Sequence, residues 1–119
     1  MCETPEHDPR ITVLLTSEFL GTGPEELGRV LIRAFLKTCK GLAPNLKHVI
    51  LINTGVRLAL EGSPVVDDLH ALEEGGAEVL SCGTCLDYFQ AKESLRAGRV
   101  SNMQEIVTTL AASDRVLHP

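Results

Sequence analysis

The sequence is poor in aromatic residues and contains no tryptophan. Phe, Trp and Tyr together make up 3% of its 119 residues, so a hydrophobic core has to be built from aliphatic side chains. A base-stacking surface of the kind found in single-stranded nucleic-acid binders is therefore not expected. An excess of positive charge is also missing. The formal net charge is -5, whereas a phosphate backbone attracts a basic surface. We expect no nucleic-acid partner.

Long apolar runs are missing as well. No stretch reaches the roughly 18 apolar residues of a transmembrane helix. The first ten residues are polar, acidic and contain proline, the reverse of a secretory signal. We therefore expect a cytoplasmic protein with no membrane partner, in a compartment where thiols are normally reduced. The four cysteines are then expected to be reactive or buried rather than paired in a disulfide framework.

Length and composition are typical of a single globular domain. Hydrophobic residues account for 44% of the chain, and about 100–150 residues is the common size of a domain with its own core. We predict a flexible N-terminal tail at residues 1–10 and one domain at residues 11–119.

Apolar runs alternate with amphipathic segments along the chain. Strands are predicted at residues 11–15, 48–53, 77–81, about 97–100 and 115–118. Helices are predicted from Pro24 to about residue 40, from 64 to about 74, from 85 to about 95, and after Ser101. This alternation indicates an α/β fold, a three-layer α/β/α sandwich whose mostly parallel sheet has about five strands.

Local patterns predict the helix faces and caps. In the first helix, apolar residues at helical spacing are expected to pack on the sheet; they are Leu27, Val30, Leu31, Ala34, Phe35 and Thr38. Ser63 and Thr84 are predicted to cap the second and third helices. Ser101 and Gln104 match a capping box for the last helix.

Cys82 and Cys85 are the most informative residues of the chain. They directly follow the third predicted strand in the stretch Cys82-Gly83-Thr84-Cys85, at the edge where open α/β sheets place their chemistry. Helix-start amides favour negative charge, so we expect the sulfur of Cys82 to be a thiolate that solvent can reach. Asp87 would oppose this ionisation if it points at the sulfurs.

Two other loops are predicted to lie at the same edge, because they also follow parallel strands. They contribute Ser17 from the first loop, and Asn53, Gly55 and Arg57 from the second. Arg57 would favour the thiolate if its side chain faces the sulfurs.

A single Cys-x-x-Cys motif is open to several interpretations. Zinc usually needs four ligands, and no second pair at suitable spacing accompanies this one, so we predict no metal and no cofactor. The pair could instead be a dithiol redox site or a buried, inert pair of thiols. Cys39 is expected to be buried packing, and Gly28 to make a close contact between a helix and the sheet.

Four groups of residues together resemble one known family. They are Leu20-Gly21-x-Gly23-x-x-Glu26-Leu27-Gly28; Asn53-x-Gly55-Val56 with Glu61-Gly62-Ser63; Leu80-Ser81-Cys82-Gly83-Thr84-Cys85-Leu86-Asp87; and Asn102-Met103. From Ile11 to about Leu117, the chain resembles the DsrE/DsrF-like sulfur-relay family. The resemblance is greatest to the C-terminal domain of YedF-type proteins, which are sulfurtransferase-like and linked to selenium metabolism.

This resemblance implies a five-stranded parallel α/β/α sandwich that assembles into dimers, trimers or hexamers. It implies that Cys82 carries sulfur as a persulfide, with Cys85 as a neighbour that resolves or stabilises it. YedF-type proteins usually carry an N-terminal TusA-like domain. Ten polar residues do not supply one, so such a domain is expected to be missing, on a separate chain or outside this sequence.

We therefore hypothesise a sulfurtransferase-like carrier of sulfur or selenium. It would relay a persulfide on Cys82 from a protein donor to an acceptor thiol, a TusA-like domain being one candidate partner. Two alternatives stay open at this point: a non-catalytic oligomeric binding module with inert thiols, and a dithiol oxidoreductase that uses Cys82 and Cys85.

Overall fold

The computed structural model describes residues 8–119 and contains one five-stranded sheet. The strands are β1 (Ile11–Leu15), β2 (Leu46–Leu51), β3 (Glu78–Cys82), β4 (Arg99–Ser101) and β5 (Arg115–Leu117). Their order across the sheet is β4-β3-β2-β1-β5, and every neighbouring pair is parallel. The predicted α/β class and parallel sheet are thus confirmed.

Four α-helices and three short 3₁₀ helices connect the strands. The α-helices are α1 (Glu25–Cys39), α2 (Val66–Glu74), α3 (Gly83–Tyr88) and α4 (Met103–Ala112). The 3₁₀ helices are η1 (Lys40–Leu42), η2 (Asn53–Ala59) and η3 (Lys92–Ser94). None of the helices in residues 8–119 is long and apolar enough to span a membrane.

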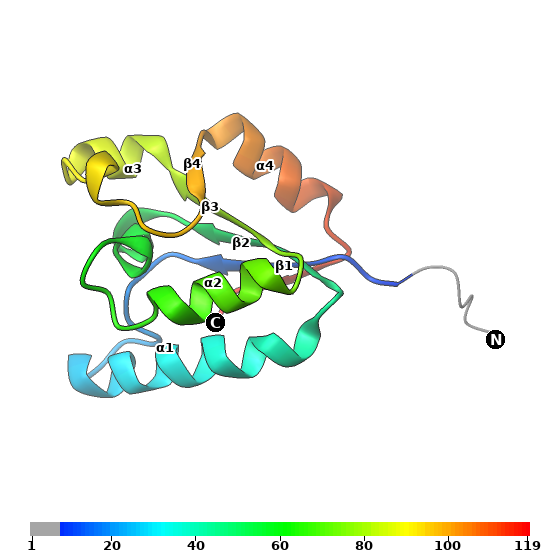
Figure 1. Cartoon of the computed structure of the whole chain (residues 1–119), viewed down its shortest axis with the longest axis horizontal. Coiled ribbons are helices and arrows are strands. Elements are labelled where there is room, and N and C mark those ends of the chain that lie inside the picture. The colour runs from blue at the N-terminus through cyan, green and yellow to red at the C-terminus, as the bar shows by residue number, and fades with distance from the viewer. Residues whose placement is uncertain (1–7) are drawn as a thin grey trace.

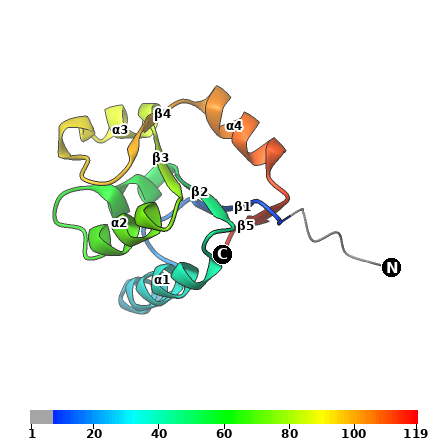
Figure 2. The same ribbon diagram turned by 45° about the vertical axis from the view of Figure 1, so that its right-hand side comes forward.

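The strand order explains which helix covers which face. Each step from β1 to β2 to β3 moves in the same direction, so right-handed connections put α1 and α2 on one face. The connection from β4 to β5 returns across the whole sheet, so α4 lies on the other face (Figure 1 and Figure 2). The short α3 follows directly after β3. The result is the three-layer arrangement that the alternating pattern predicted.

Side-chain alternation along the strands divides the core into two parts. The larger part lies under α1 and α2 and includes Val13, Leu36 and Leu69, all 0% exposed. The smaller part lies under α4 and consists of Ile50, Leu80, Cys82 and Ile106, with partly buried neighbours. Ile106 is the one buried residue of α4, so a single helix with a narrow contact closes this face.

The predicted apolar stripe of α1 is wrong by about one position. The buried residues of α1 are Gly28, Ile32, Leu36 and Cys39, and Phe35 is partly buried. Leu27 and Val30 are 51% and 60% exposed. The reason is the close contact at Gly28, which fixes the rotation of the helix: a Cβ there would lie 2.7 Å from the Cβ of Phe19, in the loop before α1. The prediction for Gly28 therefore holds for a close contact, but with this loop rather than with the sheet.

The predicted caps are also wrong in detail. The hydroxyl of Ser63 accepts a hydrogen bond from the Val65 N–H (3.2 Å) in the turn before α2. Thr84 lies inside α3. At α4 the cap is Asn102, whose Oδ1 accepts from the N–H of Glu105 at 2.8 Å. Short polar side chains bond nearby N–H groups in turns and caps alike, so their presence does not fix the first helical residue.

The third helix is shorter than predicted, because it ends at Tyr88 and not near residue 95. Gln90 has φ of +54°, the N–H of Gln90 bonds the carbonyl of Asp87, and the N–H of Ala91 bonds that of Leu86. These two bonds form a Schellman motif, which usually has glycine at the left-handed position. With glutamine there, the sequence carries no visible stop signal.

The predicted tail at residues 1–10 falls mostly on residues 1–7, which lie outside the described residues. Pro9 and Arg10 are already hydrogen-bonded to the domain. The carbonyl of Pro9 accepts from the side-chain amide of Asn45 (3.1 Å), and the N–H of Arg10 bonds a carboxylate oxygen of Asp114 (2.8 Å).

Candidate functional site

Cys82 is the last residue of β3, and its side chain points to the α4 face. It lies in the small core part with Ile50, Leu80 and Ile106 and is 2% exposed. The expectation that solvent reaches this sulfur is therefore wrong. The reason is strand alternation: residues 80 and 82 share one face of β3, and α4 closes that face.

Cys85, one turn into the structure that follows, is the more accessible thiol of the pair. It is partly exposed, and its Sγ accepts a hydrogen bond from the backbone N–H of Asn53 at 3.1 Å. Cys85 also packs against the small core part that contains Cys82. Both are free thiols, Cys82 buried and Cys85 partly exposed, so one sulfur of the pair is sheltered and the other is accessible.

The surroundings of Cys85 disfavour its thiolate. Burial raises the pKa of the Cys85 thiol, the N–H of Asn53 lowers it, and the neighbouring Cys82 raises it further; the net pKa lies above the ordinary value. The pKa of Cys85 is therefore raised, whereas the amides at a helix start would lower it. Because α3 is short and the sulfur of Cys85 is partly enclosed, burial outweighs the effect of these amides.

Asn53 reaches the sulfur because its backbone is left-handed. Its φ is +53°, and its own Oδ1 accepts from the N–H of Thr54 at 2.8 Å, which holds the turn at the start of η2. Gly55 packs this turn against the end of β1: a Cβ there would lie 2.4 Å from the carbonyl oxygen of Leu15. Asn53 thus contacts Cys85 directly, and the close packing of Gly55 fixes the turn that holds Asn53 in place.

Arg57 does not face the sulfurs. Its guanidinium forms an ion pair with Glu18 at 3.0 Å and lies over the ring of Phe89, 4.5 Å from the ring centre. Asp87 is likewise engaged elsewhere, since its carboxylate pairs with Lys92 at 3.1 Å and is 64% exposed. Neither charge acts on the thiols in the way the sequence suggested.

The remaining predicted residues shape the loops. The hydroxyl of Ser17 accepts from the N–H of Phe19 at 3.0 Å within its own turn. Gly83 is buried, and a Cβ there would lie 3.0 Å from the carbonyl oxygen of Ser101. Thr84 is exposed. The structure therefore brings Asn53 to Cys85, whereas the Ser17 hydroxyl bonds within its own turn and Thr84 is exposed.

Sequence reasoning missed Glu18 and Phe89 as parts of this edge. Phe89 is four residues after Cys85, and its N–H bonds the carbonyl of Cys85 at 3.1 Å, so the two side chains share one face of the α3 turn. This spacing was available in the sequence. The partner of Arg57 was not, because Glu18 is 39 residues away.

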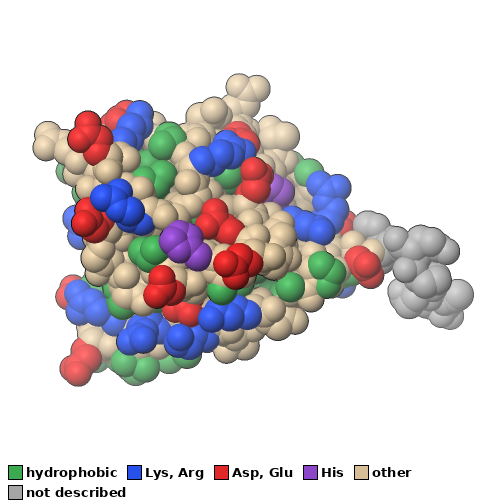
Figure 3. Space-filling model, in the orientation of Figure 1, with side chains coloured by type: hydrophobic (Ala, Val, Ile, Leu, Met, Phe, Trp, Pro, Cys, Tyr) green, Lys and Arg blue, Asp and Glu red, His purple; other side chains and the backbone are tan. Residues whose placement is uncertain are grey.

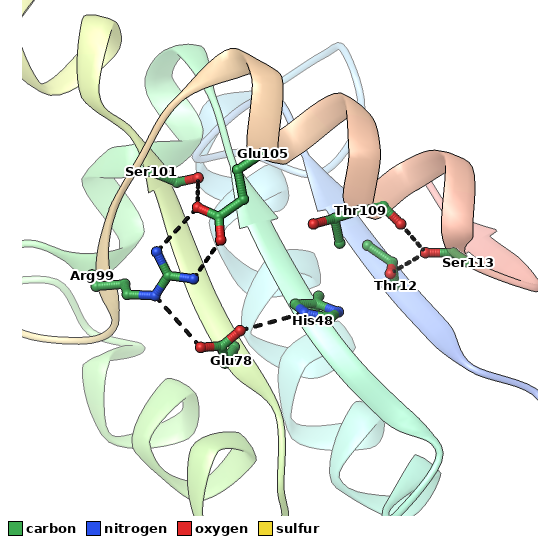
Figure 4. A network of polar contacts seen from close by, with 8 residues as sticks. All are labelled: Thr12, His48, Glu78, Arg99, Ser101, Glu105, Thr109 and Ser113. Carbon is green, nitrogen blue, oxygen red and sulfur yellow. Dashed lines mark hydrogen bonds and ion pairs between the residues drawn. The ribbon is translucent and has the colours of Figure 1, made fainter.

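A polar network ties α4 to the strands of the sheet (Figure 4). Arg99 of β4 pairs with Glu105 of α4 and with Glu78 of β3, and His48 of β2 lies 3.4 Å from Glu78. The hydrogen bond from Arg99, together with one from Ser101, lowers the pKa of Glu105 to about 2. The network thus links α4 to three neighbouring strands beside the small core part that contains Cys82.

Residues 8–119 contain no group of three or more His, Cys, Asp or Glu side chains placed to hold a metal ion. Cys39, at the end of α1, is 4% exposed, which confirms that it is core packing. Burial raises the pKa of its thiol. The chemistry available at the edge is therefore that of the Cys82–Cys85 pair.

The fold and the site together define a general class of protein. It is an α/β protein with an open parallel sheet and a cysteine pair at the carboxyl edge, after the third strand. The family model of the DsrE/DsrF-like family matches residues 10–119. The chain therefore belongs to the DsrE/DsrF-like family, as its motifs suggested. A search of curated proteins found no match.

Solved structures show the same fold at low sequence identity. The ychN protein from E. coli is 17% identical, with a TM-score of 0.69 over 92% of this chain and 99% of that one. MTH1491 from Methanobacterium thermoautotrophicum, described as a protein of unknown function, is 16% identical, with a TM-score of 0.70 over 94% and 100% of the two chains. BT1422 from Bacteroides thetaiotaomicron, also described as of unknown function, is 15% identical, with a TM-score of 0.62 over 92% and 94%.

Proposed function

We propose that this chain is a cysteine-based sulfur carrier in which Cys85 receives the sulfur and Cys82 shelters it. The Cys85 thiolate attacks the outer sulfur of a donor persulfide. The sulfur–sulfur bond of the donor breaks, and its electron pair leaves on the donor thiolate, which takes up the proton that Cys85 lost. Cys85 then carries a persulfide, and no oxidant is consumed.

A second exchange of the same kind passes the sulfur to Cys82. The Cys82 sulfur attacks the outer sulfur on Cys85, the Cys85–sulfur bond breaks, and Cys85 regains its proton. The persulfide then lies under α4, away from other thiols, until an acceptor recovers it through Cys85. This order keeps the persulfide on Cys82, as the family resemblance implies, and changes only where the sulfur enters.

One observation supports this order above all. Cys85 packs against the core part that contains Cys82, yet of the two thiols only Cys85 is partly exposed, and its sulfur accepts a backbone N–H, from Asn53 at 3.1 Å. A fixed N–H donor beside a reacting sulfur stabilises the negative charge that develops there. Cys82, at 2% exposure, has a reacting neighbour but no open approach of its own.

The test is mass spectrometry of the digested protein after incubation with a persulfide donor. In the wild type the peptide with both cysteines gains one sulfur atom. In Cys85→Ser loading is lost from both positions, whereas in Cys82→Ser it persists on Cys85. Cys39→Ser, which removes a buried thiol elsewhere, is the matched control and loads normally. Undiminished loading of Cys85→Ser, or equal loading of Cys39, would contradict the proposal.

The donor and acceptor are proposed to be thiols of other proteins, a TusA-like domain among them, in the reducing cytoplasm. Selenium is an alternative cargo, because the same exchange transfers a selenium atom.

Assembly into a homo-oligomer is proposed through the exposed apolar residues of α1, Leu27, Val30 and Leu31, which are 51%, 60% and 39% exposed. Size-exclusion chromatography with light scattering tests this: Val30→Glu should lower the measured mass.

Enclosure of the thiols favours a second candidate, an oligomeric binding module whose cysteines are inert. Burial of Cys82 and the raised pKa of Cys85 are what such a module would have. Alkylation separates the two functions. A carrier requires Cys85 to react with a small alkylating reagent well before Cys82 and Cys39 do, whereas in the module all three react only when the chain unfolds. A dithiol oxidoreductase would instead form a reversible Cys82–Cys85 disulfide.

A further inference from the structure

A cavity of about 400 Å³ lies beside the thiol site. Its walls come from α1, η2, the loop at residues 61–64 and the segment just after α3, and include Arg29, Ile32, Arg57, Leu58, Pro64 and Phe89. Ile32 and Leu58 are 2% and 4% exposed, so the floor is apolar. The volume falls in the range of about 300–1,000 Å³ that is usual for small-molecule sites.

Two contacts place this cavity relative to Cys85. η2 and α3 lie side by side, joined at one end by the Asn53–Cys85 hydrogen bond and at the other by Arg57 over Phe89. Arg57 follows Asn53 by four residues, and Phe89 follows Cys85 by four residues. Four residues span about 6 Å in an α-helix and about 8 Å in a 3₁₀ helix. The cavity therefore begins roughly one helical turn from the receiving sulfur.

The charges around the cavity leave one cation available. Arg57 pairs with Glu18 at 3.0 Å, and Glu61 pairs with Arg96 at 2.8 Å. Arg29 lies over the ring of Phe19, 4.9 Å from its centre, and makes no ion pair with any of residues 8–119. A guanidinium over an aromatic ring can still donate N–H hydrogen bonds from its edge, which is how arginine binds a carboxylate.

Basic side chains continue along the same helix. α1 carries Arg29, Arg33 and Lys37, and Lys40 follows it; Figure 3 shows Lys and Arg side chains in a band along the α1 side of this face. The chain as a whole has a net charge of -5. Lys37 and Lys40 both pair with Asp68, at 3.2 and 3.1 Å, so the positive charge that α1 offers to an approaching anion comes mainly from Arg29 and Arg33.

We propose that the cavity binds a small peptide thiol with a free carboxylate, and that its persulfide is a sulfur donor for Cys85. The carboxylate pairs with Arg29, the peptide backbone lies over the apolar floor, and the sulfur extends past Phe89 toward Cys85. The peptide sulfur has to reach about one helical turn, roughly 6 to 8 Å, beyond the cavity, and two to three extended residues span about 7 to 10 Å. A single amino acid is too short to reach both ends.

This inference rests on the proposed function and names a substrate for the same thiol. The Cys85 thiolate attacks the outer sulfur of the peptide persulfide. The bond between the two peptide sulfurs breaks, its electron pair leaves on the peptide thiolate, and that thiolate takes up the proton from Cys85. The products are the Cys85 persulfide and the peptide thiol.

The experiment compares loading rates of Cys85 from glutathione persulfide and from the same persulfide with both carboxyl groups esterified. We expect the wild type to load faster from the free acid, and Arg29→Gln to lose about tenfold of that rate, in line with one charge-assisted hydrogen bond at a partly open site. Loading from the ester should not change. Arg115→Gln, an exposed arginine on β5 that is outside the cavity lining, is the matched control and should load like the wild type.

A second readout measures binding without the reaction. Titration with S-methylglutathione should shift the NMR signal of the Arg29 side chain in the wild type and in Cys85→Ser. Equal loading from acid and ester, together with an unchanged rate in Arg29→Gln, would refute this inference while leaving the carrier function intact. Failure of Cys85 to load from any persulfide would instead refute the carrier function itself.

Discussion

Gly55→Ala is the substitution that tests how η2 positions the thiol site. The added Cβ would lie 2.4 Å from the carbonyl oxygen of Leu15 and 3.1 Å from its carbonyl carbon, whereas ordinary contact begins at 3.4 Å. The backbone of η2 must therefore move by about 1 Å. The same oxygen accepts the N–H of Ile52 at 3.1 Å, so that hydrogen bond is strained as well.

The expected cost follows from overpacking, which is typically about 1–3 kcal/mol. For a domain of this size each kcal/mol lowers Tm by roughly 3–6 °C, so we expect a decrease of about 3–18 °C. The shift also moves the N–H of Asn53 away from Cys85. Because that N–H lowers the pKa of Cys85, its loss raises the pKa further and slows alkylation of Cys85 at a fixed neutral pH.

The assays are urea unfolding and the rate of Cys85 alkylation, measured on the same preparations. Gly41→Ala is the control, because a Cβ at Gly41 meets no atom within 4 Å and its φ is not positive. Stability within about 0.5 kcal/mol of wild type, the range usual for neutral surface changes, would refute the steric argument for Gly55→Ala. Lost stability with unchanged alkylation would refute the link between η2 and the thiol.

Three further predictions concern the same region. Cys85 alkylation should reach half of its maximal rate above the ordinary thiol pKa, and Cys82→Ala should shift this point to lower pH, because Cys82 raises the pKa of Cys85; a shift to higher pH would contradict this. Glu105 has a pKa lowered from 4.5 to about 2, so its stabilisation is complete above pH 4.5 and is lost as pH falls toward 2; acid unfolding of Glu105→Gln should lack this step. Ile106→Ala should cost about 2–4 kcal/mol in urea unfolding and speed Cys82 alkylation, whereas Val107→Ala, 55% exposed, should do neither.

Much of the fold could be predicted from the sequence, because it depends on patterns that act over a few residues. The β-rich runs before Thr16 and before Asn53 are continuous and apolar, as in strands buried on both faces, and the parallel sheet follows from their alternation with helices. The exact faces and ends could not be predicted. The rotation of α1 depends on Gly28 touching Phe19, and the end of α3 on a left-handed Gln90.

The position of the cysteine pair at the carboxyl end of the third strand could be predicted from the sequence, but the burial of Cys82 could not. Successive side chains of a strand point to opposite faces of the sheet, so the direction of Cys82 depends on whether β3 includes it. β3 ends at Cys82 rather than at Ser81, and the side chain of Cys82 therefore points to the face that α4 covers. The charged neighbours were misjudged for a different reason: Arg57 and Asp87 have nearer partners in Glu18 and Lys92.

The two cysteines lie where the two parts of the core meet, so the reactivity of each thiol depends on a different neighbouring element. Cys82 belongs to the small core part under α4, while Cys85 packs against both parts. Loosening α4 therefore acts on the sheltered sulfur, and moving η2 acts on the exposed one. A carrier needs this separation, since the sulfur must be open to one donor at one moment and shielded from other thiols afterwards. If Ile106→Ala and Gly55→Ala changed the reactivity of both cysteines together and in the same direction, the pair would act as one buried unit and the division of roles would fail.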